Sequence, residues 1–225
     1  IPKGVKKMKY KIAVILVLSI VLSLCGCRGR NNGDALYQDI VSHADFIQYN
    51  YDQLKEAAEI IAEVEIVDEL SEDNSYLVYS DDAYKDLLGF YSLREAKILS
   101  VYKGKEVVGD KETIRILDGV ALEGGKRYMN DGYEGVQSGK CYLVFLNDNN
   151  ASGEMSIISN DNGVIDLSDI SGAVYYDIAV KAAVEYMSDL PDAQKKEILS
   201  MDEIKRSDNI DIELTSDGSV IVEQK

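Results

Sequence analysis

One apolar run near the start of the chain decides which residues can belong to a folded body. Residues 12–24 form a thirteen-residue segment without charge; it follows five lysines, and no acidic residue precedes Asp34. A basic stretch, a short apolar segment and then small residues are typical of a secretory signal. As a helix this segment reaches about 20 Å, less than the ~30 Å hydrocarbon core of a bilayer. We therefore predict a cleaved signal over residues 1–26, with translation starting at Met8, rather than a permanent membrane span.

The end of the run, Leu24-Cys25-Gly26-Cys27, resembles the lipobox of bacterial lipoproteins. That motif has an aliphatic residue three positions before the modified cysteine and a small residue directly before it, which fits Cys27 and not Cys25. The resemblance implies cleavage after Gly26, diacylglycerol on the Cys27 sulfur, and a protein anchored on the extracytoplasmic face of the cell membrane. Two acyl chains give stable anchoring where one is marginal. A plain secretory signal and an uncleaved anchor are the alternatives.

The chain that remains is strongly acidic. Removing residues 1–26 takes away five of the 24 basic residues and none of the 40 acidic ones, which leaves a formal charge of −21. This sign disfavours nucleic acid and anionic lipid head groups as partners. We interpret the acidity as a solvated, repulsive surface, with an acidic cation-binding face as the alternative.

Cysteine and histidine are scarce. With Cys25 removed and Cys27 lipidated, Cys141 has no partner for an internal disulfide, and a single thiol in an apolar strand is usually a small buried hydrophobe. A nucleophile formed by Cys141 and the only histidine, His43, is the alternative. Zinc is disfavoured because these two residues cannot supply a usual ligand set. No cofactor is expected.

Hydrophobic periodicity predicts strands first and helices last. A polar tether, 28–33, leads into a helix over 34–50 that Asp34 can cap; Asn50 then starts a short helix that runs into a strand at 60–66, with one continuous helix as the alternative. The acidic, tyrosine-rich stretch 72–89 is interpreted as an insertion that contains a strand and a helical turn at 82–88. Further strands are predicted over 94–102, 112–117, 141–146, 155–158 and 164–167.

Turn signals and a change of period complete the prediction. Six glycines predict a long loop over 119–139, and Asn162-Gly163 predicts a hairpin between the strands at 155–158 and 164–167. Helices are expected over 175–186 and from Pro191 to about 206, followed by a hairpin of 210–214 with 220–222. The layout is α+β, with a mostly antiparallel sheet or barrel over 51–170 and a helical and hairpin appendage over 171–225.

The middle of the chain resembles a group of Gram-positive surface lipoproteins that is similar to netrin-like and metalloproteinase-inhibitor-like modules. The corresponding segments are residues 54–64, 96–104, the Gly124-Gly125 pair and 139–146. The resemblance implies a five-stranded barrel of the oligonucleotide/oligosaccharide-binding (OB) type. The paired N-terminal cysteines of netrin modules are missing, and Glu63 replaces a usual small residue, so no inhibitory activity carries over.

Known catalytic and metal-binding patterns do not fit. Aligning Gly163 with the sixth position of a calcium-binding loop puts Ile158 where a carboxylate is required, and Glu63 with Glu65 is a pair that forty carboxylates produce by chance. Tyrosines are abundant instead, and those in loop-like stretches are a candidate surface for a peptide, glycan or envelope protein, unless loops half-bury them. They are Tyr76, Tyr79, Tyr84, Tyr91, Tyr128 and Tyr133. We expect a non-enzymatic binding module, with an envelope hydrolase or modifying enzyme as the alternative.

Overall fold

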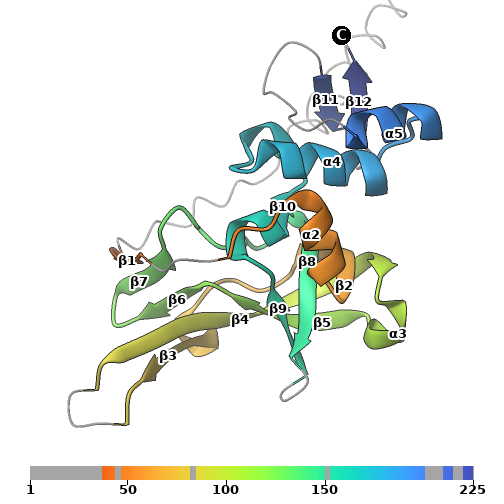
Figure 1. Ribbon diagram of the computed structural model, residues 1–225. Coiled ribbons are helices and arrows are strands. Elements are labelled where there is room, and N and C mark those ends of the chain that lie inside the picture. The colour runs from red at the N-terminus through yellow and green to blue at the C-terminus, as the bar shows by residue number, and fades with distance from the viewer. Residues whose placement is uncertain are drawn as a thin grey trace, which may run out of the picture. The chain divides into compact units, whose positions relative to one another are not determined.

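The computed structural model describes residues 37–43, 47–81, 85–149, 153–200, 210–214 and 220–224 (Figure 1). Its strands are β1 Gln38–Ser42, β2 Ile60–Ile66, β3 Ser75–Tyr79, β4 Leu87–Lys103, β5 Thr113–Asp118, β6 Val120–Glu123, β7 Lys126–Asn130, β8 Cys141–Asn149, β9 Glu154–Ile157, β10 Val164–Asp166, β11 Ile210–Leu214 and β12 Val220–Gln224. Its helices are α2 Tyr51–Ala57, α3 Lys105–Val108, α4 Tyr176–Tyr186 and α5 Asp192–Leu199, with 3₁₀ turns η1 Glu72–Asn74, η2 Asn160–Gly163 and η3 Ile170–Gly172.

Five strands close into a barrel. The hydrogen-bonded order runs β8, β2, β4, β5, β9 and returns to β8, because β9 pairs with both β5 and β8. All of these pairings are antiparallel except β5 with β9, which is parallel. The fold class is therefore α+β with a closed, mixed five-stranded barrel and flanking helices, as predicted, and it is consistent with an OB-like barrel.

Strands β2 and β8 bury both of their faces. Alternate residues, such as Val64 and Val144, point into the barrel, where they pack with Ile116 and Met155. The residues between them, such as Phe145, face outward into a second hydrophobic cluster. This two-sided burial explains the continuous apolar sequence of β8 and confirms the strand predicted there.

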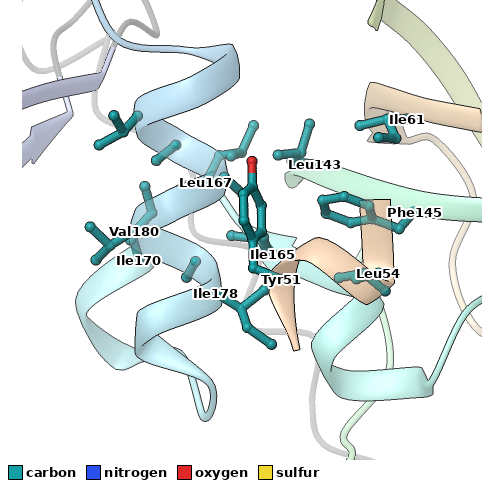
Figure 2. Close-up of a cluster of buried hydrophobic side chains, with 14 of the residues drawn as sticks. Tyr51, Leu54, Ile61, Leu143, Phe145, Ile165, Leu167, Ile170, Ile178 and Val180 are labelled. Atoms are coloured by element: carbon teal, nitrogen blue, oxygen red, sulfur yellow. The ribbon is translucent and has the colours of Figure 1, made fainter. Parts of the chain in front are cut away.

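Helices α2 and α4 cover the outward face of β2 and β8. Figure 2 shows Tyr51 and Leu54 of α2 beside Phe145, with Ile178 and Val180 of α4 on the other side of the cluster. The predicted start of α2 is confirmed, because the Asn50 side chain accepts from the backbone of Gln53 and the Gln53 side chain accepts from that of Asn50. Among the described residues no helix covers the outward face of β4 and β5, whose residues Glu95, Lys97 and Arg115 are exposed.

The helix predicted over 34–50 is wrong within the described residues. Residues 38–42 form β1, which pairs in parallel with β7, and Arg127 makes two hydrogen bonds to Asp39 across the pair at 2.9 and 3.0 Å. Helical spacing of Ile40 with its apolar neighbours was a local signal. Pairing with the distant strand β7 satisfies the hydrogen-bonding groups of the backbone, and this outweighs the local helical spacing.

The long loop predicted over 119–139 is also wrong in its first half. Residues 120–123 and 126–130 form the hairpin β6–β7 around Gly124 and Gly125, whose φ angles are +57° and +75°. A two-residue turn with positive φ at both positions suits the twist of a hairpin, and Gly-Gly supplies it. Two of the six glycines that indicated a loop are therefore the turn of a hairpin.

The hairpin predicted around Asn162-Gly163 does not form, because β9 and β10 both pair with β8 and not with each other. Asn162 and Gly163 lie in η2 instead.

The predicted helical turn at 82–88 is wrong at Leu87 and Leu88, which belong to β4, while residues 82–84 lie outside the described residues. Helix α5 ends at Leu199, earlier than predicted, and the terminal hairpin β11–β12 is confirmed. Among the described residues, no helix is long and apolar enough to cross a bilayer.

Candidate functional site

A two-stranded arm extends from the barrel. Strand β3 pairs with residues 87–92 of β4, whereas β5 begins to pair with β4 only at Ser92 and β2 only at Ala96 (Figure 1). The first residues of β4 therefore have β3 as their only strand partner among the described residues. We call residues 75–79 and 87–91 the β3–β4 arm.

Period-two alternation divides the side chains of the arm between two faces. Leu77 and Phe90 are opposite each other on the inner face, which packs on the β6–β7 hairpin. The Phe90 ring lies 5.9 Å from the ring of Tyr128, and the Ser75 hydroxyl accepts a hydrogen bond from the backbone of Leu122 at 2.9 Å. The β6–β7 hairpin thus fixes the arm from one side and leaves the other face open.

The outer face of the arm carries two stacked tyrosines. Tyr76 and Tyr91 are directly opposite in the register, with ring centroids 5.1 Å apart and planes 17° from parallel. Tyr76 is 42% exposed, Val78 on the same face is 43% exposed, and Leu88, at the irregularity in the pairing, is 68% exposed. Single exposed apolar residues are ordinary, but a group held on a rigid strand pair is a feature of binding surfaces. We call Tyr76, Val78 and Tyr91 the tyrosine face.

A buried charged network holds the base of the arm. The Arg94 guanidinium, 1% exposed, donates to the backbone carbonyl oxygens of Asp68 and Val136 at 2.6 and 2.8 Å and lies 3.6 Å from the Asp118 carboxylate. The Tyr133 hydroxyl and the Val136 amide also donate to that carboxylate, at 2.6 and 3.1 Å. Burial raises the pKa of Asp118, although these hydrogen bonds and Arg94 act in the opposite direction. The network joins β4 and β5 to the glycine-rich segment that leads to β8.

Three of the tyrosines predicted to form a surface lie on the arm. Tyr76 and Tyr91 belong to the tyrosine face, and Tyr79 donates to Glu123 at 3.3 Å from the inner side. Tyr128 and Tyr133 are buried, so for these two the surface interpretation is wrong. Tyr84 lies outside the described residues, as do Cys25 and Cys27. Val78 was missed; its alternation with Tyr76 could have indicated it.

The structure does not bring together the candidate nucleophile and base. His43, whose ring nitrogen lies 3.2 Å from the Asp131 carboxylate, follows β1 and not a helix. Burial raises the pKa of the Cys141 thiol, and the neighbouring carboxylates Glu65 and Glu63 raise it further. A catalytic thiol needs the opposite shift, toward the thiolate. This environment fits the interpretation of Cys141 as a small, partly buried apolar side chain.

An open cleft of about 380 Å³ lies between the loop before β8 and the segments around β10 and η3. Lys140 and Asp166 form an ion pair at 2.7 Å on its wall, and Asp161 also lines it. Burial opposes ionisation of Asp166, but hydrogen bonds from Lys140 and Ser168 outweigh it and lower its pKa. Burial raises the pKa of Asp161. The described residues contain no group of three or more histidine, cysteine or acidic side chains that could hold a metal ion.

Comparison of the sequence with protein-family models and with curated proteins finds no match to this chain. The geometry therefore defines a fold class only. It is an OB-like barrel whose second strand carries an arm with stacked tyrosines.

Proposed function

We propose that this chain is a lipid-anchored extracytoplasmic lipoprotein that binds a partner at the cell envelope through the tyrosine face and catalyses no reaction. The lipobox-like sequence ending at Cys27 supports the anchor. Exposed Tyr76, stacked on half-buried Tyr91 on a strand pair whose other face is packed, carries the binding proposal.

The position of the pair within the barrel adds support. OB-type barrels bind ligands on the face of their second and third strands and through the connection between the first and second. Here β2, β4 and β5 are the first three barrel strands, and β3 lies in the connection between β2 and β4. Tyrosines are enriched at the centres of interfaces because they combine a large apolar area with a polar group at small cost in side-chain entropy. A nucleic-acid ligand is disfavoured by the charge of −21.

Affinity capture from an envelope extract tests the proposal. The complete chain in a mild neutral detergent should retain a partner that the double variant Tyr76→Ala with Tyr91→Ala fails to retain. The matched control is Tyr37→Ala, because Tyr37 is 40% exposed, almost as much as Tyr76, but lies outside the arm. A partner retained equally by all three proteins, or by none, would count against a binding role for this face.

The cleft at Asp161 favours a second candidate, an envelope hydrolase. Asp161 has a raised pKa and Asp166 a lowered one, and a pair of carboxyl groups shifted apart in one cleft is the usual arrangement of a general acid and a general base. The Lys140 ion pair weakens this reading, since it occupies the carboxylate that would act as the base. The first candidate is preferred for that reason.

Hydrolysis of envelope glycans and peptides by the complete chain would support the second candidate. The activity should then disappear in Asp161→Asn and persist in Asp131→Asn, an exposed carboxyl group outside the cleft. An activity unaffected by Asp161→Asn would place the reaction elsewhere or in a contaminant.

A further inference from the structure

We propose that the β3–β4 arm binds an extended polypeptide segment rich in lysine or arginine, which adds as a new strand to the open edge of β3. This inference rests on the proposed binding function of the tyrosine face and specifies the chemistry of its partner. Its three supports are the strand edge, the side chains beside that edge, and the charges at both ends of β3.

Strand β3 has an unpaired edge. Within the part of the chain that the structure describes, β3 pairs with β4 alone, so one row of its backbone groups has no strand partner. Exposed edges usually carry lysine or proline, which discourage pairing with another chain. The sequence of β3, Ser-Tyr-Leu-Val-Tyr, contains neither. Its five residues span about 17 Å, long enough to pair with a short extended peptide.

The tyrosine face adjoins this edge. Tyr76 and Val78 alternate along β3 on the outer side, where they can contact the side chains of an added strand. The Tyr76 ring is held by stacking on Tyr91, so little rotamer freedom would be lost on binding. Backbone pairing would give general affinity, and these two side chains would select an aliphatic or cationic residue at alternate positions of the partner.

Carboxylates lie at both ends of β3. Between residues 68 and 88 the sequence has seven acidic residues and one basic residue, Lys85. Exposed Glu72 and Asp73 directly precede β3, and exposed Asp81 and Asp86 follow it. This charge complements a basic segment and repels an acidic one. A second copy of the chain is disfavoured as the partner, because it would bring a charge of −21 and the same acidic arm.

Fluorescence anisotropy with labelled synthetic peptides tests the inference. The probe is an alternating lysine–valine peptide of about eight residues, titrated with the complete chain in neutral detergent. We expect the wild type and Tyr37→Ala to bind it, and the Tyr76→Ala with Tyr91→Ala variant to bind it about tenfold more weakly or worse. Val78→Lys is a second variant at an exposed position; it should weaken binding because it places a like charge at the edge. Unchanged urea midpoints show that each variant is folded.

Two altered peptides separate strand addition from simple charge attraction. Replacing every lysine by glutamate should reduce binding by about tenfold or more. Methylating every backbone amide keeps the charges and removes the donors of both edges, so it should abolish binding. Hydrogen exchange should slow at residues 75–79 and not at 38–42 of β1, which also has an open edge.

Binding of the methylated or the glutamate peptide at full strength would overturn the inference, as would equal binding by the tyrosine variant. If envelope capture depends on Tyr76 and Tyr91 but the lysine–valine peptide does not bind, the inference fails and the proposed function stands. If envelope capture finds no partner, the proposed binding function fails, whether or not the peptide binds.

Discussion

Replacing Arg94 with methionine tests whether the buried network holds the arm and the following segment on the barrel. Methionine keeps much of the apolar stem but removes every donor of the guanidinium. The carbonyl oxygens of Asp68 and Val136 lose hydrogen bonds of 2.6 and 2.8 Å, and the Asp118 carboxylate loses its buried cation. Asp118 retains its donors Tyr133 and Val136.

The expected loss is about 4 kcal/mol of unfolding free energy near neutral pH. Removing one partner of a buried ion pair costs about 3–5 kcal/mol, and this figure already includes most of the ~1–3 kcal/mol cost of an unsatisfied buried acceptor. A domain is stable by about 5–15 kcal/mol, so the change is a large fraction of the total. The arm should lose order before the rest of the barrel, because its base is the part released.

The loss should depend on pH in a known direction. Burial already raises the pKa of Asp118, and removing Arg94 takes away an interaction that lowers it. A native carboxyl group with a raised pKa binds its proton more readily than the unfolded chain does, so ionising it costs stability as pH rises through that pKa. The penalty in Arg94→Met should therefore be larger at about pH 7 than at about pH 5, because protonation of Asp118 removes the need for a cation.

Urea unfolding measures the loss of stability at the two pH values. It is followed by circular dichroism and not by tryptophan fluorescence, because the chain has no tryptophan. Arg127→Met is the matched control: Arg127 binds Asp39 through two hydrogen bonds but is partly exposed, so its removal should change stability little. Arg94→Met combined with Asp118→Asn should recover part of the loss, because no buried charge remains at this position and the amide oxygen can still accept from Tyr133 or Val136. A loss below about 1 kcal/mol, or one equal at both pH values, would refute the role assigned to the network.

Three further outcomes are expected. Cys27→Ala should accumulate as a precursor without fatty-acid label, while Cys25→Ala is processed normally; label on the first variant would contradict the anchor. Gly135→Ala should cost about 1–3 kcal/mol in urea unfolding, because φ is +82° and a Cβ there would clash with two side chains, whereas Gly132→Ala, at φ +77° with open space around it, should cost less. Native Cys141 should react with iodoacetamide at a higher pH than in urea, since its pKa is raised; equal rates at neutral pH, measured by mass spectrometry, would argue otherwise.

Local patterns predicted the elements whose causes are local. The capping box of Asn50 and Gln53 lies within one helical turn, and the apolar run of β8 reports burial on both faces directly. Together with turn signals they were enough for the fold class and for the barrel strands. The tyrosines of loop-like stretches were a candidate surface with burial as the alternative, and the structure exposes Tyr76 and Tyr79 but buries Tyr128 and Tyr133.

Elements that depend on distant partners were not predictable in this way. Strand β1 exists because residues 88 positions later pair with it, and nothing in its own sequence reports that pairing. Tyr133 has the same side chain as Tyr76, but Tyr133 is buried and its hydroxyl donates a hydrogen bond to the distant Asp118 carboxylate. Gly124-Gly125 did carry a local hairpin signal, which the surrounding glycines obscured.

The length of β4 has a consequence for the order of folding. This one strand pairs with β3 between residues 8 to 17 positions apart and with β5 between residues 16 to 26 positions apart, so these two pairings close short loops. Barrel closure instead needs β9 to pair in parallel with β5, 39 residues away, and β8 to reach back to β2 across 76 to 86 residues. Contacts of low sequence separation form faster. The arm should therefore be present on a meander whose barrel is still open, and a partner that recognises the arm could meet it before the molecule has finished folding.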